Sequence, residues 1–175
     1  MKKLVVTYGL IAGAIVTAFM AYGVYSINKN PDYEGSMILG YTGMLVAFSF
    51  VFIGIKNFRD KQNNGMITFG KAMKIGALIS LIASSVYVGV WLIEYYCFYP
   101  DFMEKYSENV LKKLDAATMT VTEINAKKEE IAMYKELYKN PVWVILLTYS
   151  EIFPLGLIVA LISSLILKKK QVNSI

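Results

Sequence analysis

The chain has 175 residues, of which 56% are hydrophobic and 18% are charged, with a mean hydropathy of +0.47 and a formal net charge of +5. Soluble domains carry roughly 25% charged residues, so this composition argues against a soluble globular protein and favours a lipid environment. Histidine is absent and Cys97 is the one cysteine, which excludes histidine-assisted nucleophiles and an internal disulfide.

An apolar run from Leu4 to Ile27 opens the chain and is long enough to cross the hydrocarbon core as a helix. Lys2 and Lys3 before it resemble the start of a secretory signal. The apolar core of a signal has only about 7 to 15 residues, so we expect this run to be retained as a membrane span.

Two further apolar runs, residues 37–55 and 72–99, predict a second and a third span on either side of a short basic loop. The turn of this loop is Asn64-Gly65, since both residues tolerate a positive φ. Five basic side chains belong to the loop and to the adjacent span ends: Lys56, Arg59, Lys61, Lys71 and Lys74.

Three roles are open for these basic side chains. They can anchor the orientation of the two spans, contact anionic lipid, or bind a phosphate group through the planar guanidinium of Arg59, the only arginine in the chain. The loop lacks the glycine pattern that cradles phosphates, so anchoring is the favoured interpretation.

Glu94 is the first of two acidic candidates within the predicted spans. It lies near the end of the third run, where headgroups and water reach it, so we expect it to be structural. Aromatic residues gather near this level and predict an interfacial belt rather than a ligand site: Tyr95, Tyr96, Tyr99, Tyr138 and Trp143.

Earlier in the run, Ser80, Ser84, Tyr87 and Trp91 share one helical face, which we expect to point into the bundle.

Residues 100–140 are too polar to cross a membrane, but their apolar residues recur at helical spacing. Pro100 ends the third span, and Thr120 with Glu123 forms a predicted capping box within the segment. We therefore expect two helices here. They either pack as an antiparallel hairpin or leave their apolar faces for a partner helix, and the short connection favours the hairpin.

The fourth predicted span covers residues 142–167 and contains the second acidic candidate, Glu151, and a helix break at Pro154. Pro154 lacks an N–H and therefore frees the carbonyl of Ser150. An ionised carboxylate in lipid costs a few kcal/mol, and this span offers Glu151 no nearby lysine or arginine. Two roles are equally open for Glu151: holding a proton or small cation, or staying neutral and bonding a hydroxyl on another span.

The distribution of lysine predicts the orientation of the spans. Both termini and the loop between spans two and three are rich in lysine, whereas residues 100–140 balance seven lysines with eight acids. We therefore expect a multi-pass protein with both termini in the cytoplasm and with residues 28–36 and 100–140 outside.

Each predicted span carries small residues at four-residue spacing, which let helix backbones approach closely in lipid. We therefore expect an all-α membrane protein. Its single integral membrane domain is a four-transmembrane-helix bundle, with the outer helical segment 100–140 between spans three and four. The same spacing also forms homodimers, so it leaves the oligomeric state open.

Residues 54–61, GIKNFRDK, followed by Asn64-Gly65 and by ITFGKA at 67–72, resemble the signature of a bacterial membrane family known as domain of unknown function 4199. Residues 151–156, EIFPLG, resemble the last-span motif of that family, and the likeness covers nearly the whole chain. It implies a small protein of the bacterial inner, or cytoplasmic, membrane and carries over no catalytic or binding residue.

Three classes of function compete. An enzyme has the least support, since the spans contain neither histidine nor aspartate. We favour an accessory or interaction subunit that anchors an outer hairpin and a basic cytoplasmic loop. The alternative is a small proton- or cation-coupled transporter or channel component that uses Glu151.

The expected partners are the lipid bilayer, anionic lipid, and a homodimer mate or larger membrane complex. We expect no cofactor, metal or nucleic acid.

Overall fold

The computed structural model describes residues 1–29, 37–116 and 120–169, and these residues form an all-α membrane protein. Four of the described helices are long and apolar enough to cross a membrane: α1 (Lys2–Lys29), α2 (Met37–Asn57), α3 (Phe69–Ile93) and α6 (Pro141–Leu167). The predicted fold class is confirmed. α2 and α3 each continue into a π-helical turn, Phe58–Gln62 and Glu94–Phe98 respectively.

Polar caps determine where two of the spanning helices begin. The Thr68 side chain accepts a hydrogen bond from the Lys71 N–H at 3.4 Å, so α3 begins three residues before the apolar run predicted from residue 72. The Asn140 side chain accepts from the Val142 N–H at 2.9 Å, and a proline follows it at the first helical position of α6.

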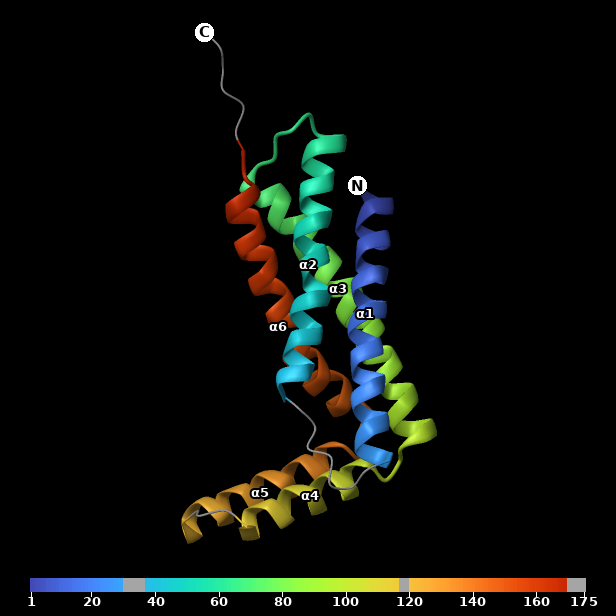
Figure 1. Ribbon diagram of the computed structural model, residues 1–175, viewed down its shortest axis with the longest axis vertical. Helices are drawn as coiled ribbons and strands as arrows, with labels where there is room; N and C mark the ends of the chain where they lie inside the picture. The colour runs from blue at the N-terminus through green and yellow to red at the C-terminus, as the bar shows by residue number, and fades with distance from the viewer. Residues whose placement is uncertain (30–36, 117–119, 170–175) are drawn as a thin grey trace.

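The four long helices pack side by side as a bundle (Figure 1). The start of α1, the connection between α2 and α3 and the end of α6 lie together at what we call the basic end, which carries Lys2, residues 56–71 and Lys168. α4 (Phe102–Ala116) and α5 (Val121–Leu137) lie at the opposite end, which we call the hairpin end. This arrangement agrees with the predicted grouping of the lysines, while the side of the membrane that each end faces stays a prediction.

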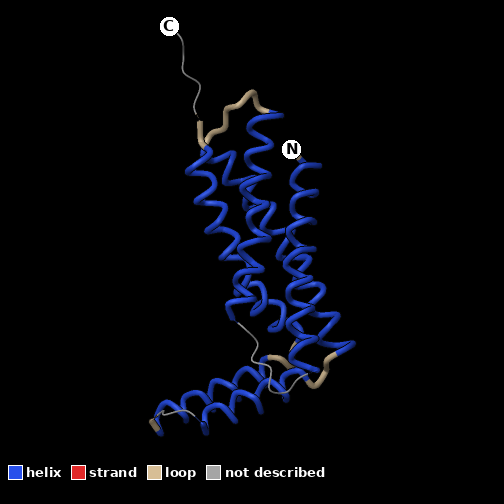
Figure 2. Tube along the Cα trace, viewed as in Figure 1, coloured by secondary structure: helices blue, strands red, loops and turns tan. Residues whose placement is uncertain are grey.

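α4 and α5 form an antiparallel hairpin that crosses the end of the bundle and projects beyond it (Figure 2). The predicted capping box at the start of α5 is confirmed. The Thr120 hydroxyl accepts the Glu123 N–H at 3.4 Å, and the Glu123 carboxylate accepts the Thr120 N–H at 2.9 Å. Among the described side chains of the hairpin, those of Met103, Ser107 and Ile131 are buried, so most of its surface is exposed.

The core of the bundle lies between α3 and its neighbours α1, α2 and α6. Its largest fully buried side chains are aromatic or β-branched and come from α2, α3, α6 and the connection between α2 and α3: Phe48, Ile55, Ile67, Ile75, Ile79 and Ile152. Glycines mark the closest helix contacts. A Cβ added at Gly9 would lie 2.7 Å from Ile82 Cβ on α3, and one at Gly76 would lie 2.7 Å from Ala160 Cβ on α6. The small-residue faces of these helices are therefore occupied within the chain.

Hydrogen bonds tie the loop at the basic end to both ends of the chain. Ile67 and Lys169 exchange backbone hydrogen bonds of 3.1 and 2.9 Å, and the N-terminal ammonium of Met1 donates to Gln62 Oε1 at 2.9 Å. The predicted turn is confirmed, with φ of 52° at Asn64 and 75° at Gly65. Residues 30–36 of the predicted first outer loop lie outside the described residues.

Candidate functional site

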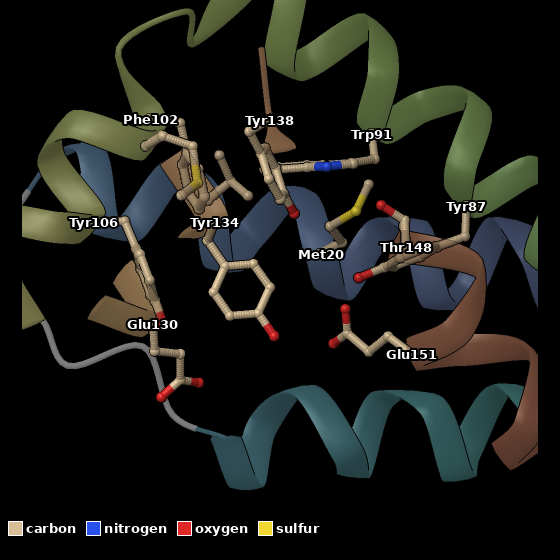
Figure 3. A pocket seen from close by; sticks show the side chains of 12 residues that line it. Met20, Tyr87, Trp91, Phe102, Tyr106, Glu130, Tyr134, Tyr138, Thr148 and Glu151 are labelled. Carbon is tan, nitrogen blue, oxygen red and sulfur yellow. The ribbon is translucent and has the colours of Figure 1, made fainter. Parts of the chain in front are cut away.

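A cavity of about 410 Å³ lies where the hairpin meets the bundle (Figure 3). Its walls come from α1, α3, α6 and the hairpin. The lining residues are Met20, Val24, Tyr87, Trp91, Phe102, Met103, Tyr106, Glu130, Tyr134, Tyr138, Thr148 and Glu151. Six of these twelve are aromatic, two are acidic and none is basic. This is the composition of a small, electronegative, ring-lined site.

Helix α3 supplies Tyr87 and Trp91, one turn apart. The predicted inward face of α3 is confirmed, since Ser80, Ser84, Tyr87 and Trp91 are all buried. The hydroxyls of Ser80 and Ser84 lie deeper in the bundle and have no hydrogen-bond partner among the described residues. A polar stripe thus runs from the cavity into the core of the bundle.

Contacts between aromatic rings hold the hairpin against the bundle. The rings of Trp91 and Phe102 meet edge to face with centroids 4.9 Å apart and an interplanar angle of 81°. Those of Tyr95 and Tyr138 meet in the same way at 5.5 Å and 74°. Each such pair stabilises by about 0.5–1.5 kcal/mol beyond the burial of area, so the rings around the cavity are held in place.

Tyr134 and Tyr138 lie one turn apart near the end of α5, and their hydroxyls point toward the cavity (Figure 3). Burial, and after it the nearby charge of Glu151, raises the pKa of the Tyr138 phenol to about 12. Tyr138 therefore keeps its proton at neutral pH. It offers the cavity a hydroxyl dipole and a ring face without adding charge.

Glu151 reaches the cavity from α6, one turn after Thr148. Its carboxylate points into the open space near the end of the Tyr87 side chain (Figure 3) and is exposed there instead of being packed in the core. The buried Thr148 hydroxyl donates to the Val144 carbonyl at 2.7 Å. No described residue forms a hydrogen bond or an ion pair with the Glu151 carboxylate, so the interhelical lock predicted as one of its two roles has no partner in this arrangement.

The other two candidates in the spans do not line the cavity. Pro154 lies inside α6, one turn beyond Glu151, with its ring exposed on the outside of the bundle. Glu94 begins the π-helical turn after α3 and is half-buried. Its Oε2 atom is buried without a hydrogen-bond partner among the described residues. Of the two acidic candidates, Glu151 is the one that faces the cavity.

The basic candidates lie at the opposite end of the bundle. Arg59 is held within the chain: its Nε donates to Asp60 Oδ1 at 2.6 Å, and a terminal nitrogen donates to the Leu167 carbonyl at 3.4 Å. It therefore joins the end of α2 to the end of α6. The other basic candidates of this end are exposed: Lys56, Lys61, Lys71 and Lys74.

Sequence reasoning did not identify Met20, Phe102 and Tyr134 as cavity walls, and it interpreted Tyr138 as part of an interfacial belt. The signal available in the sequence was the four-residue spacing of Tyr134 and Tyr138 on the apolar face of a predicted helix. That spacing does not say what the face packs against. The cavity arises because the hairpin folds back over α3 and α6, which no local pattern specifies.

One protein-family model, described as "Protein of unknown function (DUF4199)", matches residues 7–169. No curated protein and no solved structure matches the chain. The matched residues include nearly all of α1, the other three spanning helices and the hairpin, so the resemblance carried by the loop and last-span motifs is confirmed.

Proposed function

Because the chain belongs to the DUF4199 family of proteins of unknown function and folds as a four-span bundle with a projecting hairpin, we propose that it is an accessory subunit of a larger membrane complex. In this proposal the protein is not an enzyme. It resides in the bacterial inner membrane with both termini in the cytoplasm and the hairpin outside. The exposed lysines of the basic end support contact with anionic lipid.

The observation that carries this proposal is the exposure of the hairpin. Apolar side chains of the hairpin that do not line the cavity are accessible, with Val121 75% exposed and Met133 53%. The hairpin lies beyond the ends of the spanning helices, so these side chains are outside the four spans (Figure 1). Exposed apolar residues on an otherwise charged helix pair are typical of a surface that binds another helix.

A photoactivated cross-linking residue at Met133 tests the proposal in intact membranes. We expect one discrete cross-linked product with another membrane protein. The matched control places the same residue at Ile158, an exposed position on the lipid-facing side of α6, where lipid adducts should dominate. Lipid adducts alone at both positions would contradict an accessory role for the hairpin.

A second candidate function is coupling to a proton or small cation at Glu151. The observation that favours it is the cavity, which exposes the Glu151 carboxylate beside Tyr87. Deeper on the same face of α3, the Ser80 and Ser84 hydroxyls have no hydrogen-bond partner among the described residues. A carboxylate that faces an open cavity within a span is a candidate for ion handling.

Cation flux in proteoliposomes tests this second function. Glu151→Gln should abolish any proton- or sodium-dependent flux while changing the melting temperature in detergent little, because the carboxylate has no packing or hydrogen-bond role among the described residues. The control is Glu94→Gln, the same chemical change outside the cavity. A Glu151→Gln protein that loses stability and keeps its flux would favour the structural lock instead.

A further inference from the structure

We propose that the cavity binds the ammonium group of an organic amine, with Glu151 as the counter-charge and the rings of Trp91, Tyr134 and Tyr138 as walls. This inference rests on the second candidate function for the role of Glu151 and adds the class of ligand. It follows from the charge, the ring content and the size of the cavity.

The charge of the lining selects a cation. Glu130 and Glu151 are its two charged residues. Glu130 lies at the hairpin side and is already paired with Lys127, whose Nζ lies 2.5 Å from Glu130 Oε2. Glu151 has no such partner among the described residues. A bound ammonium would compensate this carboxylate, which lies within a span without an ion-pair partner among the described residues.

The rings of the lining suit an organic cation. Aromatic faces carry negative electrostatic potential and attract ammonium groups within about 6 Å of the ring centroid. Trp91, the strongest residue type for this contact, is buried against Phe102 and presents part of its ring system to the cavity. Tyr138 stays neutral at physiological pH, and its side chain lines the cavity. A multivalent inorganic cation would need several acidic oxygen ligands that converge, and the described residues contain no group of three or more acidic side chains that could hold a metal ion.

The size of the cavity limits the ligand. Its volume of about 410 Å³ is near the lower end of the range of small-molecule sites, roughly 300–1,000 Å³. The site therefore suits an amine of a few carbon atoms or the head of a larger one. Two sources share this chemistry: a soluble amine, and the ammonium headgroup of phosphatidylethanolamine reaching in at the membrane boundary.

Trp91 provides a reporter for the test. The chain has two tryptophans, and Trp143 is exposed and does not line the cavity. The full chain with Trp143→Phe, in a neutral detergent, should show a saturable change in Trp91 fluorescence on titration with tetramethylammonium chloride. Neopentyl alcohol, of similar shape and without charge, should give no saturable change. Equal responses to both probes, or no response to either, would overturn the proposal.

Matched variants in the Trp143→Phe background assign the binding to the cavity. Glu151→Gln should weaken tetramethylammonium binding about tenfold or more, and Tyr134→Leu should weaken it about threefold to tenfold. Glu94→Gln should bind like the parent. Unchanged affinity in Glu151→Gln would overturn the proposal. If the Glu151→Gln protein does not fold, the Tyr134→Leu variant provides the test, because the half-buried ring of Tyr134 belongs to the cavity wall. An unchanged affinity for tetramethylammonium in Tyr134→Leu would also overturn the proposal.

Sodium chloride titrations separate this inference from the second candidate function. A Glu151-dependent response to sodium without one to tetramethylammonium would leave cation coupling standing and overturn the ammonium site.

Nanodiscs distinguish the two sources of the amine. A weaker apparent affinity for tetramethylammonium in phosphatidylethanolamine than in phosphatidylglycerol would identify the lipid headgroup as the occupant, and equal affinities would identify a soluble amine.

Discussion

Gly76 on α3 shows how one missing side chain fixes a helix contact. A Cβ at this position would lie 2.7 Å from Ala160 Cβ and 3.2 Å from Ala160 Cα. Neither atom can rotate away, because both belong to the backbone or to the first side-chain position of α6. The contact between α3 and α6 therefore depends on glycine for its close approach, and these two helices carry the polar stripe and Glu151.

We expect Gly76→Ala to lower the free energy of unfolding by about 1–3 kcal/mol, because the added methyl group forces α3 and α6 apart. The melting temperature of the purified protein in detergent measures this. Gly89→Ala, on the same helix, has no neighbour within 4 Å of the added Cβ and should be neutral or slightly stabilising. Equal losses in the two variants would contradict the close-packing explanation, because the higher helix propensity of alanine favours a gain at both positions.

Arg59 and the neighbouring lysines should respond differently to neutralisation. Each exposed lysine near an anionic surface contributes about 1 kcal/mol to lipid binding, so Lys56→Gln with Lys61→Gln should lower the anionic lipid retained through purification. Arg59→Gln should instead lower stability by about 0.5–1 kcal/mol, because Arg59 bonds Asp60 and the Leu167 carbonyl. Lipid mass spectrometry and thermal melting measure the two effects. A greater loss of lipid in Arg59→Gln than in the lysine double variant would contradict this division.

At the scale of the element, the hairpin depends on its caps and on its base. The start of α5 is secured by the reciprocal bonds of Thr120 and Glu123, whereas buried side chains near the base dock the hairpin on the bundle. The hydroxyl and backbone N–H of Thr120 hold the pKa of the Glu123 carboxyl below its usual value. The stabilisation by this cap is therefore present above the usual pKa of a glutamate and is lost as the pH falls through the lower folded value.

Thr120→Ala should loosen the start of α5 without unfolding the bundle, because the bundle does not depend on this cap. Amide hydrogen exchange in the first turn of α5 should become roughly fivefold faster at neutral pH. Thr122→Ala, one position inside the same turn, is the control and should leave exchange nearly unchanged. The difference between the two variants should shrink at acid pH, and a difference independent of pH would argue against the carboxylate partner.

At the scale of the whole molecule, the basic end and the hairpin end are separated by the length of the spanning helices (Figure 1). Both described ends of the chain lie with the lysine-rich loop, and the hairpin lies at the other end. A protein with this arrangement has an even number of crossings, so a single pair of labelled positions determines its orientation.

Cysteine labelling of intact cells tests that orientation. In a Cys97→Ser background, Glu129→Cys on α5 should react with an impermeant maleimide from outside. Lys61→Cys should react only after the cells are permeabilised. Both positions are exposed, whereas Ser107, another hairpin position, is 1% exposed and unsuited to labelling. Reaction of Lys61→Cys from outside would reverse the predicted topology.

The amino-acid sequence by itself determined the elements of this protein. Uninterrupted apolar runs predicted four spans within a few residues of α1, α2, α3 and α6, because a helix is the way a single segment satisfies its backbone in lipid. The Thr120 capping box and the Asn64-Gly65 turn were also legible, since both depend on residues a few positions apart. Glu151 stood out because one acid in an apolar run is costly wherever the run packs.

Only the tertiary structure decided what these elements form together. Trp91 belongs to α3, Phe102 to α4 and Glu151 to α6, and Tyr138 follows the end of α5. All four side chains nevertheless line one cavity. Glu94 and Glu151 resemble each other in sequence, but one lies beside a π-helical turn and the other faces the ring-lined space. Arg59 likewise turned inward to Asp60 and Leu167. These outcomes depend on contacts between distant segments, whose free energies no local spacing encodes.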